Sequence, residues 1–383
     1  MTRRTGTVVS GVRMPYIVPG NDLPDLVVTN VLEVSKIKES DVVAVTESIV
    51  ATTQGNFAST DDIGKDVEAK FGKNEHIGVV FPIISRNRFS QLLKGISKGA
   101  KKVTVLLNYP QDEVGNPIVD LKKWNPYDFS VKKGEEQFTG KEFRKKYGEY
   151  LHEFTNLDYI DLYTGLNDNI EVILSRDPAE ILTHTSNVIA ADIHGRERTK
   201  EYLLKKGAKK VLTLAEILNE KSDKHGYNET YGLLGSNMLG KTDKVKLFPR
   251  DCDKFVKTVQ DEFFKRVGVR PNVMVYADGA FKDPACGIWE LADPVVCPGN
   301  TSGLEGAPNE VKLKSVVADQ KDKEAALRKA LEDKDKDKNI GLGTTPRKYT
   351  DLLGSLSDLV SGSGDKGTPV VLIQGYFDNL LME

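Results

Sequence analysis

The segment Val273-Met274-Val275-Tyr276-Ala277-Asp278-Gly279 decides how the rest of the chain is interpreted. Its first five residues form a short apolar run, which is typical of a strand buried in a sheet. The run ends at Asp278, and Gly279 then favours a turn. A carboxylate at the end of a buried strand is well placed to hold a metal ion or a phosphate group. It can equally cap the next turn. The segment therefore predicts a core strand and makes Asp278 a candidate site residue.

The bulk composition narrows the class of protein. The 383 residues include 54 Lys and Arg against 56 Asp and Glu, so the net charge is -2. This balance argues against a general nucleic-acid or membrane binder. Three cysteines without paired spacing argue against a disulfide framework and fit a reducing compartment. We see no signal peptide or membrane span and expect a cytoplasmic protein of two domains, or one with an insertion.

The hydrophobic pattern divides the chain into three parts. Near the N-terminus we predict a helix over 23–34, capped by Asn21 or Asp22, and a strand over 41–45. Between 76 and 226 the segments 77–84, 86–99 and 102–107 indicate a strand–helix–strand unit. Further strands are predicted over 170–174 and 210–214, with helices over 140–154 and 196–206. We interpret 76–226 as an inserted α/β module between core segments 1–75 and 227–383.

Two polar clusters in the module are candidates for binding. Ser85-Arg86-Asn87-Arg88 follows a predicted strand and begins a helix, a position that favours anions because N–H groups are free there. Arg86 and Asn87 are therefore candidate substrate-binding residues. The second cluster runs from Asp192 to Arg198 and includes His194. A lone histidine beside an aspartate is more often a solvated or capping residue than a catalyst.

Two glycine-containing segments could bind phosphate. Residues 235–242 satisfy the phosphate-loop pattern, but the residues that follow alternate like a strand instead of forming the required helix. Residues 361–367 are richer in glycine, which lets backbone N–H groups approach an anion. This second segment can also be a plain helix-to-strand connection.

The sequence lacks the zinc and nucleophile motifs of common hydrolases. It has five scattered histidines, so a metal would be a hard cation held by carboxylates. The candidate ligands are Asp278, Glu305, Glu310 and Asp319.

Three blocks together resemble the coenzyme F-420:γ-glutamyl ligase family. The first comprises residues 14–23 and 41–56, the second Gly235-Ser236-Asn237 with 247–251 and 275–281, and the third 358–375. Their order matches the family across about 1–60 and 230–380. The resemblance implies a mixed-sheet α+β fold, usually in a homodimer. It also implies a ligase that uses GTP and Mg²⁺ or Mn²⁺ to join L-glutamate to a carboxylate of a cofactor precursor.

The resemblance also assigns roles by position. Asp278 would be the catalytic metal-binding residue and Glu310 a second ligand, with Asn309 or Asp319 as alternatives. Ser236 and Asn237 would contact substrate. The residues around the nucleotide would be Met14, Pro15, Tyr16, Ile17, Glu47, Ser48, Thr52, Gly362, Ser363 and Gly364.

This sequence departs from the family at several of these positions. Ser48 and Thr52 stand where the family has lysines, Gln54 replaces a glutamate and Asn56 an arginine. Gly279 replaces the threonine that follows the metal-binding aspartate. The two lysines would supply positive charge near a phosphate, and here Arg86, Arg88 or Lys241 could restore that charge.

Amide formation in water requires an activated carboxylate. Phosphoryl transfer from a nucleoside triphosphate gives an acyl phosphate, which the amine of glutamate then attacks, so no protein nucleophile is needed. The alternatives are a folate or pterin γ-glutamyl ligase and a non-catalytic small-molecule binder on the same scaffold. A metal-dependent phosphohydrolase is a third.

Overall fold

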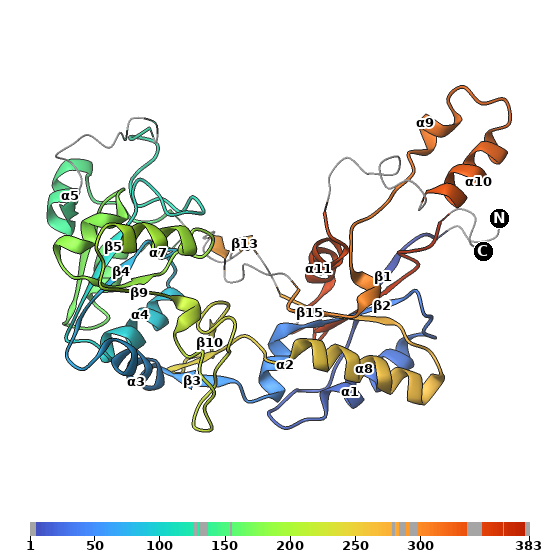
Figure 1. Ribbon diagram of the computed structural model, residues 1–383, viewed down its shortest axis with the longest axis horizontal. Coiled ribbons are helices and arrows are strands. Elements are labelled where there is room, and N and C mark those ends of the chain that lie inside the picture. The colour runs from blue at the N-terminus through green and yellow to red at the C-terminus, as the bar shows by residue number, and fades with distance from the viewer. Residues whose placement is uncertain are drawn as a thin grey trace. The chain divides into compact units, whose positions relative to one another are not determined.

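The computed structural model divides the chain into two compact units. The first comprises 1–53, 251–278 and 295–383, and the second comprises 54–250 and 279–294. The structure describes residues 5–125, 127, 129, 137–153, 155–277, 280–282, 289–291, 297–334, 347–362 and 364–379, with backbone alone in 280–282 and 289–291. Figure 1 shows the elements of each unit.

A five-stranded mixed sheet forms the centre of the first unit. Its strand order is β1 (Val8–Val12), β16 (Val370–Gln374), β2 (Val42–Thr46), β12 (Asn272–Tyr276) and β15 (Gly299–Asn300). Strands β2 and β12 are parallel, and the other neighbours are antiparallel. The apolar run that begins at Val273 is thus a central strand, as predicted. Mixed sheets with separate helices are consistent with the predicted α+β class.

Helices cover both faces of this sheet. On one face α1 (Leu23–Val34) and α8 (Cys252–Val267) lie side by side and pack on Val43, Val45 and Val273 (Figure 1). On the other face α11 (Tyr349–Val360) packs through Leu353 on Ala44 and Met274. Alternate residues of β2 and β12 therefore face opposite layers, which explains why both strands are apolar throughout. Asp22 caps α1, as predicted, by accepting the N–H of Asp25 at 3.2 Å.

The remaining elements of the first unit are short. They are α2 (Glu47–Thr53), a 3-10 turn η4 (Ser302–Leu304), α9 (Leu313–Val317) and α10 (Lys323–Asp333).

The second unit is built on a six-stranded sheet. Its order is β6 (Phe138–Thr139), β7 (Ile170–Leu174), β5 (Lys102–Leu107), β4 (His76–Val80), β8 (Asn187–Ala190) and β9 (Lys210–Thr213). All neighbours are parallel except β6 with β7. The predicted strand–helix–strand unit is confirmed, because β4 and β5 are parallel neighbours joined through α4 (Phe89–Lys98).

Helices also cover both faces of the second sheet. One face packs against α3 (Thr60–Phe71), α4, α5 (Gly140–Tyr147) and α6 (Tyr159–Thr164). The other packs against α7 (Arg196–Lys205) and the 3-10 turn η2 (Pro178–Thr183). Smaller elements are η3 (Leu214–Glu216), the sheet of β10 (Asn237–Met238), β11 (Lys244–Lys246) and β3 (Phe57–Ser59), and the pair β13 (Ala280–Lys282) and β14 (Trp289–Leu291).

The boundaries of the second unit differ from the predicted limits of 76 and 226. Residues 54–75 and 227–250 belong to this unit because their side chains share its core. Ile63 and Val67 of α3 pack with the strands, and so do Val245 and Leu247 of the later segment. The predicted helix over 140–154 is also too long, because Gly148 at φ 88° ends α5.

Glycines allow α3 and α4 to cross closely. A Cβ on Gly95 would lie 2.8 Å from Cβ of Ile63, and one on Gly99 would lie 2.1 Å from the carbonyl oxygen of Gly64. Both contacts are shorter than packed atoms tolerate, so the small residues set the distance between the helices.

We expect Gly95→Val to destabilise the second unit by about 1–3 kcal/mol, because the added methyl groups overpack this crossing. Denaturant unfolding of both proteins measures the difference. Gly6→Val is the matched control, because Gly6 has nothing within 4 Å of an added Cβ. Equal destabilisation by the two changes would contradict the packing argument.

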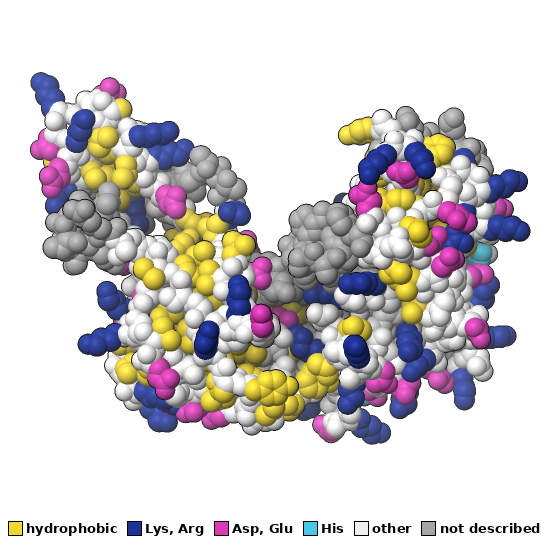
Figure 2. Space-filling view, turned by 180° about the vertical axis from the view of Figure 1, so that it is seen from behind, with side chains coloured by type: hydrophobic (Ala, Val, Ile, Leu, Met, Phe, Trp, Pro, Cys, Tyr) yellow, Lys and Arg dark blue, Asp and Glu magenta, His cyan; other side chains and the backbone are white. Residues whose placement is uncertain are grey.

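Figure 2 shows the charged side chains on one face of the molecule. On this face, basic and acidic side chains are mixed within each unit instead of gathering in one patch. Among the described residues, no helix is long and apolar enough to cross a membrane.

Candidate functional site

One edge of the first sheet gathers most of the residues assigned to a nucleotide. Val12 of β1 pairs with Val370 of β16, and Val370 pairs with Val45 of β2. Thr46 of β2 pairs with Tyr276 of β12. The residues after β1, β2 and β12 and those before β16 therefore meet at the same edge. We call this the 46/276 edge.

Two chain segments are tied together at the 46/276 edge. The N–H of Met14 donates to the carbonyl oxygen of Gly367 at 2.9 Å, and Gly362 and Thr368 exchange backbone hydrogen bonds. This places residues 14–17 beside the glycine-containing loop 361–367. Pro15 and Tyr16 are exposed, with Tyr16 at 91%, while Met14 and Ile17 pack on the core. Because the Tyr16 side chain is exposed to solvent beside the glycine-containing loop, it is accessible to a ligand.

Two exposed basic residues outside the predicted site set, Arg13 and Lys366, also lie here. Lys366 is exposed within the loop, and its side chain lies against Gly362, where an added Cβ would be 2.6 Å from it. Arg13, the residue before Met14, is exposed as well. Both cations are therefore candidates to pair with a phosphate bound at the loop. The sequence alone could have indicated Lys366, because it is the lysine within the predicted glycine-containing loop.

Helix α2 begins directly after β2 and carries the other predicted residues. Glu47 is its first residue, so its carboxylate belongs to the 46/276 edge. Ser48 is half-buried, and its carbonyl oxygen accepts the Thr52 hydroxyl at 2.8 Å. That bond lies within the helix, and the uncharged Thr52 hydroxyl supplies no positive charge where the family has a lysine.

Two thiols lie close to this edge without being nucleophiles. Burial, with the negative charges of Asp253 and Glu47, raises the pKa of Cys252 to about 12. Burial also raises the pKa of Cys297 to about 12. Both thiols are therefore protonated at neutral pH, and this agrees with a reaction that needs no protein nucleophile.

The predicted acidic residues do not all lie together. Asp278 and Ser363 lie outside the described residues, although β12 ends at Tyr276 on the 46/276 edge. Glu310 contributes to raising the pKa of Tyr376, after burial itself. Tyr376 follows the far end of β16, where Ile373 pairs with Val42. The structure thus places Glu310 toward the opposite edge of the sheet.

Glu305 and Asp319 belong to segments other than those that meet at this edge. Glu305 follows η4, which begins next to the start of β12, since the Thr301 N–H donates to Val273 at 2.9 Å. Asp319 is exposed between α9 and α10. Within the described part of the chain, no group of three or more His, Cys, Asp or Glu residues could hold a metal. Among the described residues, Glu47 is the carboxylate closest in the strand register to the end of β12. Its oxygens suit Mg²⁺ or Mn²⁺, so it could bind a metal together with a second ligand after β12.

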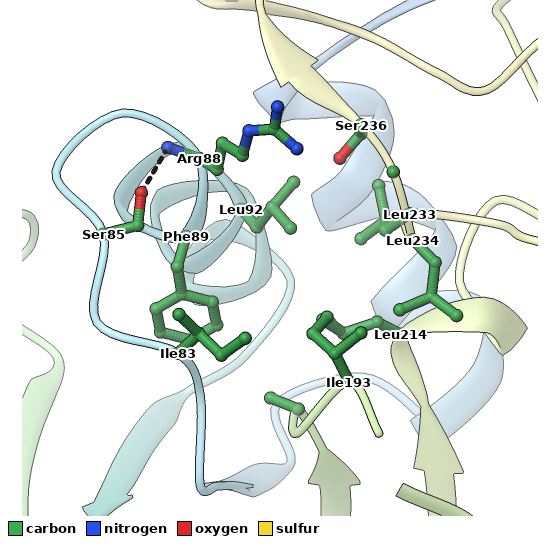
Figure 3. Close-up of a pocket in the computed structure, with 12 residues that line it drawn as sticks. Ile83, Ser85, Arg88, Phe89, Leu92, Ile193, Leu214, Leu233, Leu234 and Ser236 are labelled. Atoms are coloured by element: carbon green, nitrogen blue, oxygen red, sulfur yellow. Dashed lines mark hydrogen bonds between the residues drawn. The ribbon is translucent and has the colours of Figure 1, made fainter. Parts of the chain in front are cut away.

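In the second unit, the two predicted substrate-binding segments meet around one cavity (Figure 3). Ser85 and Arg88 come from the loop before α4, and Gly235 and Ser236 come from the loop before β10. The walls are apolar, and Ser236 is 3% exposed with a hydroxyl that has no hydrogen-bond partner. The volume is about 40 Å³, which suits water molecules or a small group and not a whole cofactor.

Neighbouring candidates do not line this cavity. The Ser85 hydroxyl accepts the N–H of Arg88 at 3.0 Å and of Asn87 at 3.3 Å, and this turn leaves Arg86 exposed. Arg88 points to the cavity instead (Figure 3). Asn237 accepts the N–H of Met238 at 2.9 Å in β10. Residues 235–242 include β10 and most of the turn to its antiparallel partner β11, so the phosphate-loop pattern lacks its helix, as predicted.

Comparison with known proteins now decides the family. The sequence model of F420-0:gamma-glutamyl ligase matches residues 11–375, which spans both compact units. The chain belongs to the F420-0:gamma-glutamyl ligase family. Membership implies a ligase enzyme. A comparison with curated proteins finds no significant match.

Gln54 and Asn56, two positions where this ligase differs from the family pattern, form hydrogen bonds through their side chains. The side chain of Gln54 exchanges hydrogen bonds with the backbone of Arg250, at 2.7 and 2.9 Å. The amide of Asn56 donates to Phe248 at 2.7 Å and accepts the N–H of Tyr227 at 3.0 Å. Both side chains thus hold segments of the second unit together, and their polar groups are already used.

A substitution in the glycine loop tests whether the ligase binds phosphate there. An added Cβ on Gly364 meets nothing within 4 Å, so Gly364→Val should fold normally. We expect it to weaken nucleotide binding by about 10-fold or more, since a side chain blocks close approach to backbone N–H groups. Calorimetric titration of GTP and ATP measures the change, with Gly6→Val as the control. Unchanged affinity would remove the loop from the site.

Proposed function

We propose that this protein joins the amine of L-glutamate to a carboxylate of F420-0, using a nucleoside triphosphate to activate that carboxylate. The family match over residues 11–375 carries the proposal. The convergence of residues 14–17, Glu47 and loop 361–367 at the 46/276 edge supports it, because a nucleotide needs several chain segments around it.

Each part of the edge has a role in this proposal. Backbone N–H groups of the glycine loop, with Lys366 and Arg13, bind phosphate oxygens. The exposed Tyr16 covers the nucleoside. Glu47 and Asp278 hold the divalent cation, in place of the pair Asp278 and Glu310. When bound, that cation neutralises charge on the phosphate oxygens.

The proposed chemistry has two steps. The acceptor carboxylate attacks the terminal phosphorus of the nucleoside triphosphate, the bond from that phosphorus to the nucleoside diphosphate breaks, and an acyl phosphate results. The deprotonated amine of glutamate then attacks the acyl carbon, and phosphate leaves as the amide forms. Residues that fix the two reactants and exclude water are sufficient for both steps.

The experiment combines purified protein, F420-0, L-glutamate, Mg²⁺ or Mn²⁺ and either GTP or ATP. We expect a glutamylated product by mass spectrometry only when all components are present. Nucleotide cleavage that proceeds equally without glutamate would favour a phosphohydrolase and overturn the proposal. Replacing F420-0 by a folate or pterin tests the alternative acceptor.

A further inference from the structure

The sheet of the second unit contains a topological switch point. From β4 the chain first adds β5 and β7 on one side of the sheet. It then returns to add β8 and β9 on the other side. The carboxyl ends of β4 and β8 are therefore neighbours whose following loops diverge to opposite faces. Crevices of this kind are where open parallel sheets bind their ligands.

A pocket of about 450 Å³ lies at this switch point. Its lining comes from the loops after three adjacent strands, through Phe81, Asn108 and Asp192, and from Arg198 and Tyr202 of α7. The volume lies within the range of small-molecule sites, roughly 300–1,000 Å³.

A buried carboxylate borders the pocket, and one of its oxygens has no hydrogen-bond partner. Asp192 is 4% exposed, and its Oδ2 accepts the Thr199 hydroxyl at 2.8 Å. Its Oδ1 is buried and has no hydrogen-bond partner. A Cβ on Gly195 would lie 2.5 Å from Oδ2, so the glycine makes room for the carboxylate at the start of α7. A buried acceptor without a donor is costly unless a ligand supplies one.

The other carboxylates in the pocket already have donors. Asp112 accepts the N–H groups of Ile84 and Asn116 at 3.0 and 2.9 Å. Glu113 accepts the N–H of Ile193 at 2.5 Å and that of His194 at 3.2 Å. These bonds fix the loops around the pocket. Asp192 is therefore the carboxylate that remains to receive a ligand, while Arg198 supplies a positive charge at the rim.

We infer that the switch-point pocket is a second ligand site, separate from the 46/276 edge, that binds a ribonucleoside or its 5′-monophosphate. The 2′- and 3′-hydroxyls of ribose donate to Asp192, which is how a carboxylate at such a crevice recognises ribose. The base lies against the apolar and aromatic wall formed by Phe81, Pro82, Pro178 and Tyr202. Where a phosphate is present, Arg198 pairs with it.

The test is calorimetric titration of the full chain, without divalent cations, with adenosine, guanosine, their 5′-monophosphates and the matching 2′,3′-dideoxynucleosides. We expect one base to bind as the ribonucleoside, and its dideoxy analogue to bind at least about 10-fold more weakly because the charge-assisted bonds to Asp192 are lost. A monophosphate that binds more tightly, with the gain lost in Arg198→Gln, identifies a nucleotide ligand. Equal binding identifies a nucleoside.

Variants complete the test. Asp192→Asn should lose at least about 10-fold in affinity and no longer distinguish the dideoxy analogue. Glu197→Gln is the control, since this exposed residue of α7 does not line the pocket. Absence of binding by every compound, or equal affinity for ribose and dideoxyribose forms in the wild type, would overturn the inference. Asp278→Asn should not change nucleoside binding measured without metal. The result of this titration is therefore independent of whether the proposed ligase activity is correct.

Discussion

Glu47→Gln is expected to lower glutamate-dependent nucleotide turnover by about 100-fold or more. Glu47 begins α2 directly after β2, and the register of β2 with β12 brings it to the end of the strand that precedes Asp278. Glutamine keeps the shape and removes the charge, so the binding of a divalent cation loses several kcal/mol of electrostatic support. Initial rates of product formation, measured over a range of Mn²⁺ concentrations, show the effect.

Glu310→Gln provides the matched control. Glu310 lies near Tyr376, toward the opposite edge of the sheet, so the same change there should leave turnover within about twofold of wild type because surface charges act weakly at a distance. If Glu310→Gln were inactive and Glu47→Gln active, the ligand pair assigned by family resemblance would be right and our placement of the metal wrong.

Asp278→Asn is expected to abolish metal-dependent binding of GTP and ATP. The residue follows β12, which pairs with β2 at the 46/276 edge. Asparagine is a poorer ligand for Mg²⁺ or Mn²⁺ than a carboxylate, since it brings no negative charge. We expect product formation to fall by about 1,000-fold or more as the charge on the phosphates goes uncompensated. Titration calorimetry with and without Mn²⁺ separates loss of binding from loss of chemistry.

Asp319→Asn is the control for this variant, because Asp319 is an exposed carboxylate named as an alternative ligand from the sequence. It should bind nucleotide like wild type. Metal-dependent nucleotide binding that survives in Asp278→Asn would remove the end of β12 from the site.

Much of the first unit could be predicted because its signals are local. The apolar run at Val273 and the cap at Asp22 depend on neighbouring residues, and the structure has β12 and α1 at these places. The convergence of Met14, Glu47 and Gly362 was expected from resemblance alone. Only the pairing of β1, β16, β2 and β12 shows that these distant segments share an edge.

What could not be predicted depends on tertiary contacts. The sequence favours Arg86 over Arg88 for binding. The order of residues does not show that the Ser85 hydroxyl forms a turn that directs Arg88, and not Arg86, to the cavity. The switch-point pocket depends on β8 lying beside β4, and its residues span 81 to 202 in the sequence. Likewise, the resemblance assigns Glu310 from its place in the acidic segment downstream of Asp278, and the order of residues does not show which edge of the sheet a loop reaches.

The central claim is that the enzyme activates an acceptor carboxylate as an acyl phosphate for attack by glutamate. The most direct test uses acceptor labelled with ¹⁸O in its carboxylate, with unlabelled nucleotide, glutamate and Mn²⁺. We predict that one labelled oxygen appears in the released phosphate, at a yield equal to the glutamylated product. Phosphate without label, or released at the same rate in the absence of glutamate, would contradict the account.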